Sequence, residues 1–199
     1  MVAIDSTSVT LGSLKSNASR PELVHSTLRD KGNRAVAQLC PECALCCNGV
    51  LFGDVELQSK DDAEQLAASG LRIEQKGKKL RFLQPCSCLD GTLCGIYADR
   101  PMRCRTFECR LLQKVQRKAL TVAAALKSIH EARQQVKTVR RLLKELGQND
   151  DHLPLSRRYA KVVAEPIDLG GDERMIELRS ELMLAVHKLT KILQRDFLT

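Results

Sequence analysis

The sequence predicts an α+β protein, in which a small cysteine-rich domain is followed by a helical hairpin of two long helices. All nine cysteines lie between residues 40 and 109, among short segments with the alternating pattern of strands. Residues 110–199 contain no cysteine, and their apolar residues recur every three or four positions, which is the spacing of one helix face. Because aromatic residues make up only 3% of the chain, an aliphatic core is expected, which fits helices.

We expect three segments along the chain. Residues 1–32 form an N-terminal tail and a short helix, for which Ser19 is the expected N-cap and Gly32 the stop. Residues 33–109 form the cysteine-cluster domain. Residues 110–199 form the helical extension.

The expected elements of the cysteine-cluster domain are short. Residues 50–57 have the composition of a strand. A short helix follows, with Ser59 as its N-cap and Gly70 just past its end. Residues 71–83 predict a β-hairpin that turns at Gly77, because apolar and polar residues alternate on both sides of it.

The helical extension contains the two long helices. Residues 111–146 predict one continuous amphipathic helix that Gly147 ends. A short helix over residues 155–165 precedes the last long helix, which Asp172 caps. We expect the two long helices to pair with each other as an antiparallel hairpin, or with a second chain in a homodimer.

The net charge of +8 is concentrated in one part of the chain. Residues 100–146 hold 13 Lys and Arg but only 3 Asp and Glu. A basic stripe at helical spacing is formed by Arg133, Lys137, Arg140 and Lys144. Such a stripe binds the phosphates of nucleic acid or an acidic protein, or it is simply a solvated helix face, and charge alone does not separate these readings.

The compartment in which the protein lies decides whether its cysteines are reduced thiols or disulfides. No apolar run is long enough to cross a bilayer, and the first residues lack the basic and apolar regions of a secretory signal. We therefore expect a cytoplasmic protein with no membrane partner, in which thiols stay reduced. An odd number of cysteines also argues against a framework of disulfides.

Clustered, reduced cysteines at short spacing indicate a metal site. The run Cys40-x2-Cys43-x2-Cys46 places several thiols close together, and thiolates bind zinc, iron and iron–sulfur clusters. No histidine lies within the clusters, so the ligands are expected to be sulfur only. The adjacent Cys46 and Cys47 are expected to point in different directions, which favours two neighbouring sites or one polynuclear site.

These residues match a family pattern: CxxCxxCC, a cysteine ahead of Leu-Asp, Cys-x-Ile-Tyr, Arg-Pro-x-x-Cys-Arg and a last cysteine. The chain has Cys40, Cys43, Cys46, Cys47, Cys86 ahead of Leu89-Asp90, Cys94-Gly95-Ile96-Tyr97, Arg100-Pro101, Cys104-Arg105 and Cys109. It thus resembles the CxxCxxCC cysteine-cluster proteins (the YkgJ type), known as zinc- or iron-chelating and as iron–sulfur-cluster-containing proteins. The resemblance implies that these eight cysteines bind the metal, which is zinc, iron or an iron–sulfur cluster. Cys88 lies outside the pattern, and we expect it to pack without ligating.

Three further residues are expected to surround the metal. Arg100 and Arg105 lie among the last cysteines, where their guanidinium groups would offset the negative charge of thiolates. Tyr97 is expected to pack over the site. Pro101 suits the first turn of a helix, with Asp99 as its expected cap.

A catalytic role stays open at this stage. One branch of the family resembles flagellin lysine N-methylases, so an iron–sulfur-dependent protein methyltransferase is an alternative. The sequence lacks a G-x-G-x-x-G after a strand, and its four histidines are scattered, with none beside a cysteine. The third alternative is a binding module for nucleic acid or an acidic protein, in which the metal is structural and the basic helix makes the contact.

Overall fold

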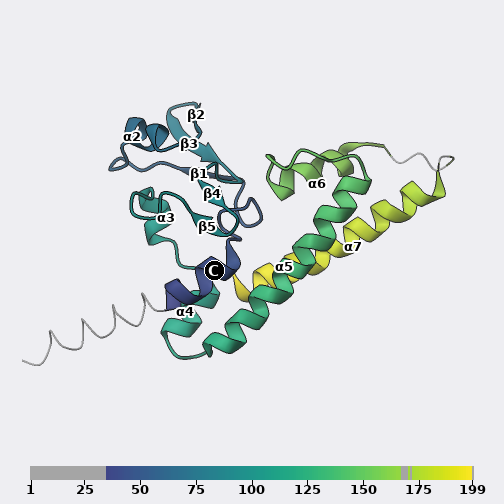
Figure 1. Cartoon of the computed structure of the whole chain (residues 1–199). Helices are drawn as coiled ribbons and strands as arrows, with labels where there is room; N and C mark the ends of the chain where they lie inside the picture. Colours follow the sequence, from purple (N-terminus) through teal and green to yellow (C-terminus); the bar gives the residue numbers. More distant parts are fainter. Residues whose placement is uncertain (1–34, 167–169, 171, 199) are drawn as a thin grey trace, which may run out of the picture.

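The computed structural model describes residues 35–166, 170 and 172–198. It confirms the α+β class: a part with small antiparallel sheets lies beside a part made of long helices (Figure 1). The predicted tail, the helix from Ser19 to Gly32 and one of the histidines, His25, lie outside the described residues.

A three-stranded antiparallel sheet carries the first small core. Its strands, in the order β1-β3-β2, are β1 (Asp54–Glu56), β2 (Ile73–Lys76) and β3 (Lys79–Leu83). The predicted hairpin is confirmed, since Ile73 pairs with Phe82 and Gly77 turns the chain with a φ of 60°. Phe82 is buried against Leu66 and Leu71, and Ile73 packs beside them, whereas Leu80 is 40% exposed and does not belong to this core.

The short helix α2 (Ala63–Ala68) follows β1, but its N-cap differs from the prediction. Asp62 is the cap, because its side chain accepts a hydrogen bond of 3.0 Å from the backbone N–H of Gln65. The assignment of Ser59 as N-cap is therefore wrong, and the cap lies three residues later. Gly70 lies just past the helix end with a φ of 94°, as predicted.

A second, two-stranded sheet and the helix after it were not fully anticipated. The sheet pairs β4 (Leu89–Asp90) with β5 (Leu93–Cys94). Helix α3 (Met102–Thr106) begins one residue later than expected, because Pro101 is its N-cap residue and not part of its first turn, and Asp99 does not cap it. Instead, Asp61 reaches across from the loop before α2, and its carboxylate accepts a hydrogen bond of 2.7 Å from the N–H of Met102. The expected local cap is replaced by one that only the tertiary fold provides.

The single long helix predicted over residues 111–146 is two helices. Helix α4 (Arg110–Gln116) ends where Lys118 adopts a φ of 59°, and α5 (Val122–Glu145) begins after it. The side chain of Thr121 accepts a hydrogen bond from Ala124 N–H and so caps α5. The turn between them lets α4 fold back against α5 (Figure 1).

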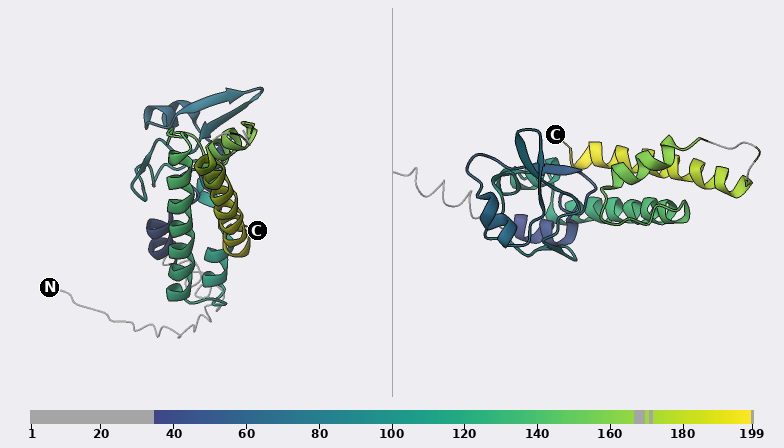
Figure 2. Two further views of the ribbon diagram at one scale, coloured as in Figure 1. Left: turned by 90° about the vertical axis from the view of Figure 1, so that its right-hand side faces the viewer. Right: turned by 90° about the horizontal axis from the view of Figure 1, so that it is seen from above.

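The two long helices pack side by side, as predicted. Helix α6 (Leu155–Ala164) connects α5 to α7 (Glu173–Asp196), and Asp172 caps α7. The antiparallel orientation follows from contacts at opposite ends: Arg195 pairs with Glu131, and Arg174 lies near Glu145. The Figure 2 views show both helices as one elongated pair. Among the described helices, none is long and apolar enough to span a membrane.

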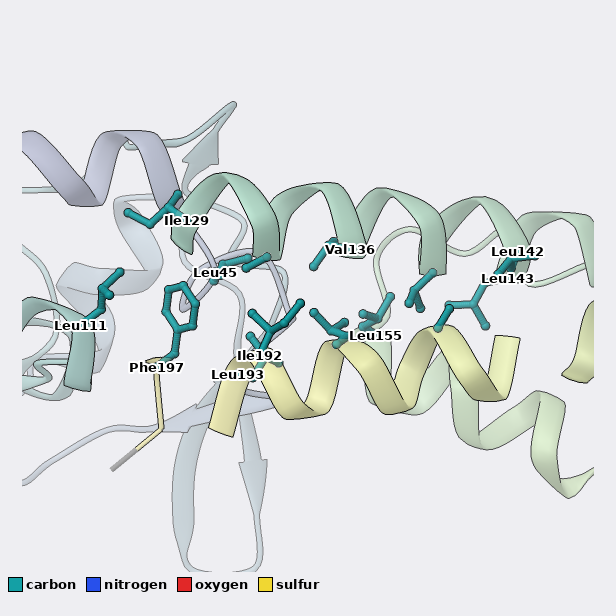
Figure 3. Packing of buried hydrophobic residues seen from close by; sticks show 14 of the residues in the cluster. Leu45, Leu111, Ile129, Val136, Leu142, Leu143, Leu155, Ile192, Leu193 and Phe197 are labelled. Carbon is teal, nitrogen blue, oxygen red and sulfur yellow. The ribbon is translucent and has the colours of Figure 1, made fainter. Parts of the chain in front are cut away.

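One hydrophobic core joins the helices to the first cysteine segment. A helix over residues 35–43 precedes the CxxCxxCC loop, and its Leu39 is buried against the helical part. Leu45, inside the loop, is fully buried in the same core, and Phe197 at the end of α7 lies near it (Figure 3). The helical part therefore forms one wall of the region that holds the cysteines.

Candidate metal centre

The CxxCxxCC motif occupies the end of a helix and a tight turn. Ala44 leaves the helix over residues 35–43 with a φ of 54°, and the N–H of Cys47 donates back to its carbonyl at 2.9 Å. Gly49 closes the turn at a φ of 78°, where an added Cβ would lie 3.1 Å from Pro85 and 3.2 Å from Pro154. Only glycine fits this close approach with this backbone conformation.

The second group of cysteines comes from several elements. Cys86 follows the sheet strand β3, and its N–H donates to the carbonyl of Cys47 at 2.9 Å. Cys94 ends the short strand β5, Cys104 lies in α3, and Cys109 is the N-cap residue of α4. The fold thus brings thiols to the CxxCxxCC turn from four separate places.

Eight of the nine cysteines line one cavity of about 1190 Å³. They are Cys40, Cys43, Cys46, Cys47, Cys86, Cys94, Cys104 and Cys109. Cys88 is absent from the lining, and its thiol lies 3.6 Å from the carbonyl oxygen of Ser69. The cysteines that line the cavity are therefore the same eight that match the family pattern, and Cys88 is left out of both sets.

The eight thiols line the same cavity, but they are not positioned as the complete ligand set of a metal ion. Within the part of the chain that the structure describes, no three His, Cys, Asp or Glu side chains are grouped as a metal site. The sulfurs of Cys46 and Cys47 lie 3.5 Å apart. The expectation that these two adjacent side chains diverge is wrong, because they lie in a turn, where the alternation of a strand does not apply.

Burial in the cavity keeps the thiols protonated when no cation is near. It raises the pKa of Cys43, Cys86 and Cys104 to about 12 each. The pKa of Cys47 is also raised, first by its hydrogen bond with Cys46 and then by burial. Cys40 is the one exposed cysteine of the group, and its pKa is raised less, to about 11. A bound metal cation would reverse this preference, since thiolates are its ligands.

Arg100 is a cation that acts on half of these eight thiols. Its positive charge lowers the pKa of four thiols, although burial and neighbouring thiols raise each of these pKa values by more. The four are Cys40, Cys47, Cys94 and Cys104. Its guanidinium lies 3.8 Å from the ring centroid of Tyr97, and its Nε donates to the Tyr97 carbonyl at 3.0 Å. Arg105 also lines the cavity and donates to the carbonyl of Arg100. Tyr97 thus orients Arg100 from the cavity rim, where Tyr97 itself is 52% exposed.

Two arginines of the basic stripe on α5 bind the CxxCxxCC segment. Arg133 donates to the carbonyl of Glu42, between the first two cysteines. Arg140 donates to the carbonyl of Asn48 at 3.1 Å, directly after the last cysteine of the motif. Lys144 pairs with Asp151 at 3.2 Å. The charge pattern could reveal the stripe, but it gave no sign that backbone carbonyls of the same chain are its partners.

Replacing Arg133 and Arg140 by Ala is expected to loosen the cysteine turn. Hydrogen bonds to charged groups contribute roughly 1.5–3 kcal/mol each when buried, and less for Arg133, which is more exposed. We expect a lower melting temperature and a weaker hold on metal in a competition with a chelator. Lys137→Ala is the matched control, since Lys137 is an exposed member of the same stripe. Equal metal retention in both variants would show that the stripe does not support the turn.

The three histidines that the structure describes contribute nothing to the cavity. His130, His152 and His187 are all exposed, and none of them lines it. Among the described residues that line the cavity, the thiols are therefore the ligands best suited to a soft metal. Asp54, Glu56 and Glu108 also line the cavity, so a ligand set of sulfur only stays a prediction.

The arrangement defines an α+β protein with a cysteine-lined cavity. The sequence model of one protein family, described as "Putative zinc- or iron-chelating domain", matches residues 39–141. The chain belongs to this family, CxxCxxCC. The match includes α4 and most of α5, so it extends well past the last cysteine. No curated protein and no solved structure matches the chain.

The residues present fit the metal that the family description implies. Zinc and iron both accept four thiolates, and the cavity offers eight thiols from one turn and four further positions. Arg100 supplies a positive charge beside them, which suits an anionic thiolate centre. When bound, the metal would supply structural cross-linking or, as iron, a redox centre.

Proposed function

We propose that this protein binds zinc or iron through the eight cysteines of the cavity, in the cytoplasm, where they stay reduced. The observation that supports this most directly is the lining itself, which includes the eight cysteines of the family pattern and leaves out Cys88. A protein that merely used cysteine as a small apolar residue would give no reason for this division.

The position of the cavity indicates what binding would do to the fold. Cys43 and Cys109 pack against the core of the long helices, whereas Cys86 and Cys104 pack against the core of the sheet. A metal held by thiols from both sides would fasten the two cores together. Binding would also release protons, because thiols with raised pKa must ionise to become ligands. The proposed role is therefore metal chelation that also stabilises the contact between the two cores. Where the metal is iron, the role would extend to metal handling or redox chemistry.

The basic helix gives less support to nucleic-acid binding than its sequence suggests. Arg133 and Arg140 are directed at carbonyls of the cysteine turn. Because these two arginines bind a turn of their own chain, a phosphate partner is not needed to account for their positive charge in the stripe.

The double change Cys43→Ser and Cys94→Ser is expected to remove most of the bound metal. Each residue lies in a different part of the cavity wall, and serine keeps the size of the side chain without a thiolate. Elemental analysis of the purified protein measures the result. Cys88→Ser is the matched control and should keep the full metal content. Full metal in the double variant, or loss of metal in Cys88→Ser, would contradict the ligand assignment.

A further inference from the structure

We infer that the cavity takes a second ligand besides the metal: a small organic anion with an aromatic body and a hydrogen-bond donor. The inference is carried by the buried side chain of Gln84, a pair of phenylalanine rings and the arginines in and beside α3. These groups belong to the part of the wall that the thiols leave free. The inference therefore goes beyond metal binding and does not depend on which metal is bound.

The cavity is larger than a thiolate metal centre requires. A bound zinc ion would lie only about 2.3 Å from its sulfur ligands, in the space directly beside the thiols. The whole cavity measures about 1190 Å³, whereas pockets for small organic molecules measure roughly 300–1,000 Å³. Much of the remaining wall is apolar and includes Phe52, Phe82, Leu111 and Phe197. An apolar molecule therefore has both room and contact surface in this cavity.

Gln84 carries an unused hydrogen-bond acceptor in the cavity wall. The residue is only 2% exposed and lines the cavity, and no described residue donates to its side-chain oxygen Oε1. Its backbone is fixed, because its N–H donates to the carbonyl of Gly53 at 3.1 Å. A buried acceptor without a partner costs free energy, so it calls for a donor from outside the chain. An N–H or O–H group of a bound molecule would provide that donor.

Two phenylalanine rings connect the Gln84 side of the wall to helix α3. The ring centroids of Phe52 and Phe107 are 5.0 Å apart in an edge-to-face arrangement. Phe52 directly precedes Gly53, which binds Gln84, and Phe107 directly follows α3. Both rings line the cavity, and Phe107 is 37% exposed. An aromatic ligand can pack against these rings in the geometry that aromatic side chains prefer among themselves.

The arginines in the lining give this part of the cavity a positive charge. Arg100, Arg103 and Arg105 lie in α3 or two residues before it, and no described carboxylate forms an ion pair with any of them. Arg100 is already held by Tyr97, whereas Arg103 and Arg105 are exposed. A guanidinium binds a carboxylate or phosphate through paired hydrogen bonds. The anionic group of the ligand is therefore expected at Arg103 and Arg105.

The carboxylates of the lining do not cancel this charge. Asp54 pairs with Arg81 at 2.5 Å, and Glu56 pairs with Lys79 at 2.8 Å. The carboxylate of Glu108 accepts a hydrogen bond of 2.9 Å from the uncharged side chain of Gln116. Among the described residues of the lining, three arginines thus face one carboxylate that no Lys or Arg neutralises.

Two fluorescent probes that differ by one anionic group test the site. Anilinonaphthalene sulfonate has fused rings, an N–H donor and a sulfonate, and phenylnaphthylamine is the same molecule without the sulfonate. Both are titrated into protein purified without oxygen, and metal content is measured on the same sample. The variants are Gln84→Met and the pair Arg103→Gln with Arg105→Gln. The pair Arg72→Gln with Arg157→Gln is the matched control, since both residues are exposed and lie outside the lining.

We expect the wild-type protein to bind one sulfonate probe per chain. The Arg103 and Arg105 pair should bind the sulfonate probe about fivefold more weakly and the neutral probe unchanged, because only the anion loses a partner. Gln84→Met should weaken both probes, because both donate the same N–H. The control pair should change neither. Circular dichroism checks that each variant is folded, and the arginine pair decides alone where Gln84→Met is not.

The inference would be overturned by a wild-type protein that binds no sulfonate probe, or by a folded Arg103 and Arg105 pair with undiminished affinity for it. Equal weakening of both probes by that pair would also overturn it, since this would mean apolar binding without recognition of the anion. The proposed function is judged separately. Metal without probe binding would refute the organic ligand alone, and probe binding without metal would contradict the proposed function alone.

Discussion

Removal of the metal by a strong chelator is expected to unfold the cysteine region over residues 40–109 while the long helices stay partly formed. Binding of a structural zinc contributes on the order of 10 kcal/mol to folding in small domains, which is as large as the whole stability of many proteins. The sheet part has a small core of three buried residues, whereas the helices share a much larger one. The sheet part therefore depends more on the metal.

Hydrogen exchange measured by mass spectrometry distinguishes the two parts of the chain. After chelation, we expect backbone amides of β1 to β3 and α3 to lose protection, while those in the middle of α5 and α7 keep most of theirs. Addition of metal should restore the protection, which serves as the control against irreversible damage. Unchanged exchange in the sheet part would mean that the metal does not hold this region together.

Leu45→Ala is expected to be the most damaging single change outside the cysteines. Leu45 is 0% exposed and lies between the second and third cysteines of the motif, in the core shared with α5 and α7. Truncating a buried leucine costs roughly 2–5 kcal/mol, because it removes apolar contact and leaves a cavity. The same change frees the cysteine turn from the helices, so we expect metal affinity to fall as well.

Urea unfolding and a chelator competition measure the two effects of Leu45→Ala. Leu184→Ala is the matched control, since Leu184 in α7 is 71% exposed and should cost almost nothing. If Leu45→Ala lowered stability but left metal affinity unchanged, the turn would not depend on the helical core for its shape.

The parts of the fold that the sequence predicted are those with a long or clearly periodic pattern. The hairpin of β2 and β3 follows from alternation around Gly77, and α7 follows from its helical spacing and Asp172. The break between α4 and α5 was missed because the apolar spacing continues across it. Only Thr121 signals the new start. The strands β4 and β5 have two residues each, too few for alternation to be visible.

Contacts between distant segments account for most of what the sequence did not reveal at the site. The eight cysteines were found through the family pattern, and the cavity gathers the same eight. The close approach of Cys46 and Cys47 depends on turn geometry that spacing does not encode. Arg133 and Arg140 donate hydrogen bonds to the cysteine turn, and Asp61 accepts one from the first residue of α3. In each case the partner lies some 40 to 90 positions away in the sequence. A charge pattern shows which residues are basic but not what they bind.

Metal analysis of the protein purified without oxygen tests the central claim most directly. Zinc, iron and acid-labile sulfide are measured on one sample, beside a variant in which all eight cavity cysteines are Ser. The account predicts zinc or iron bound to the wild-type chain and none to the variant. A wild-type protein that carries neither metal and takes up neither when it is supplied would contradict the account.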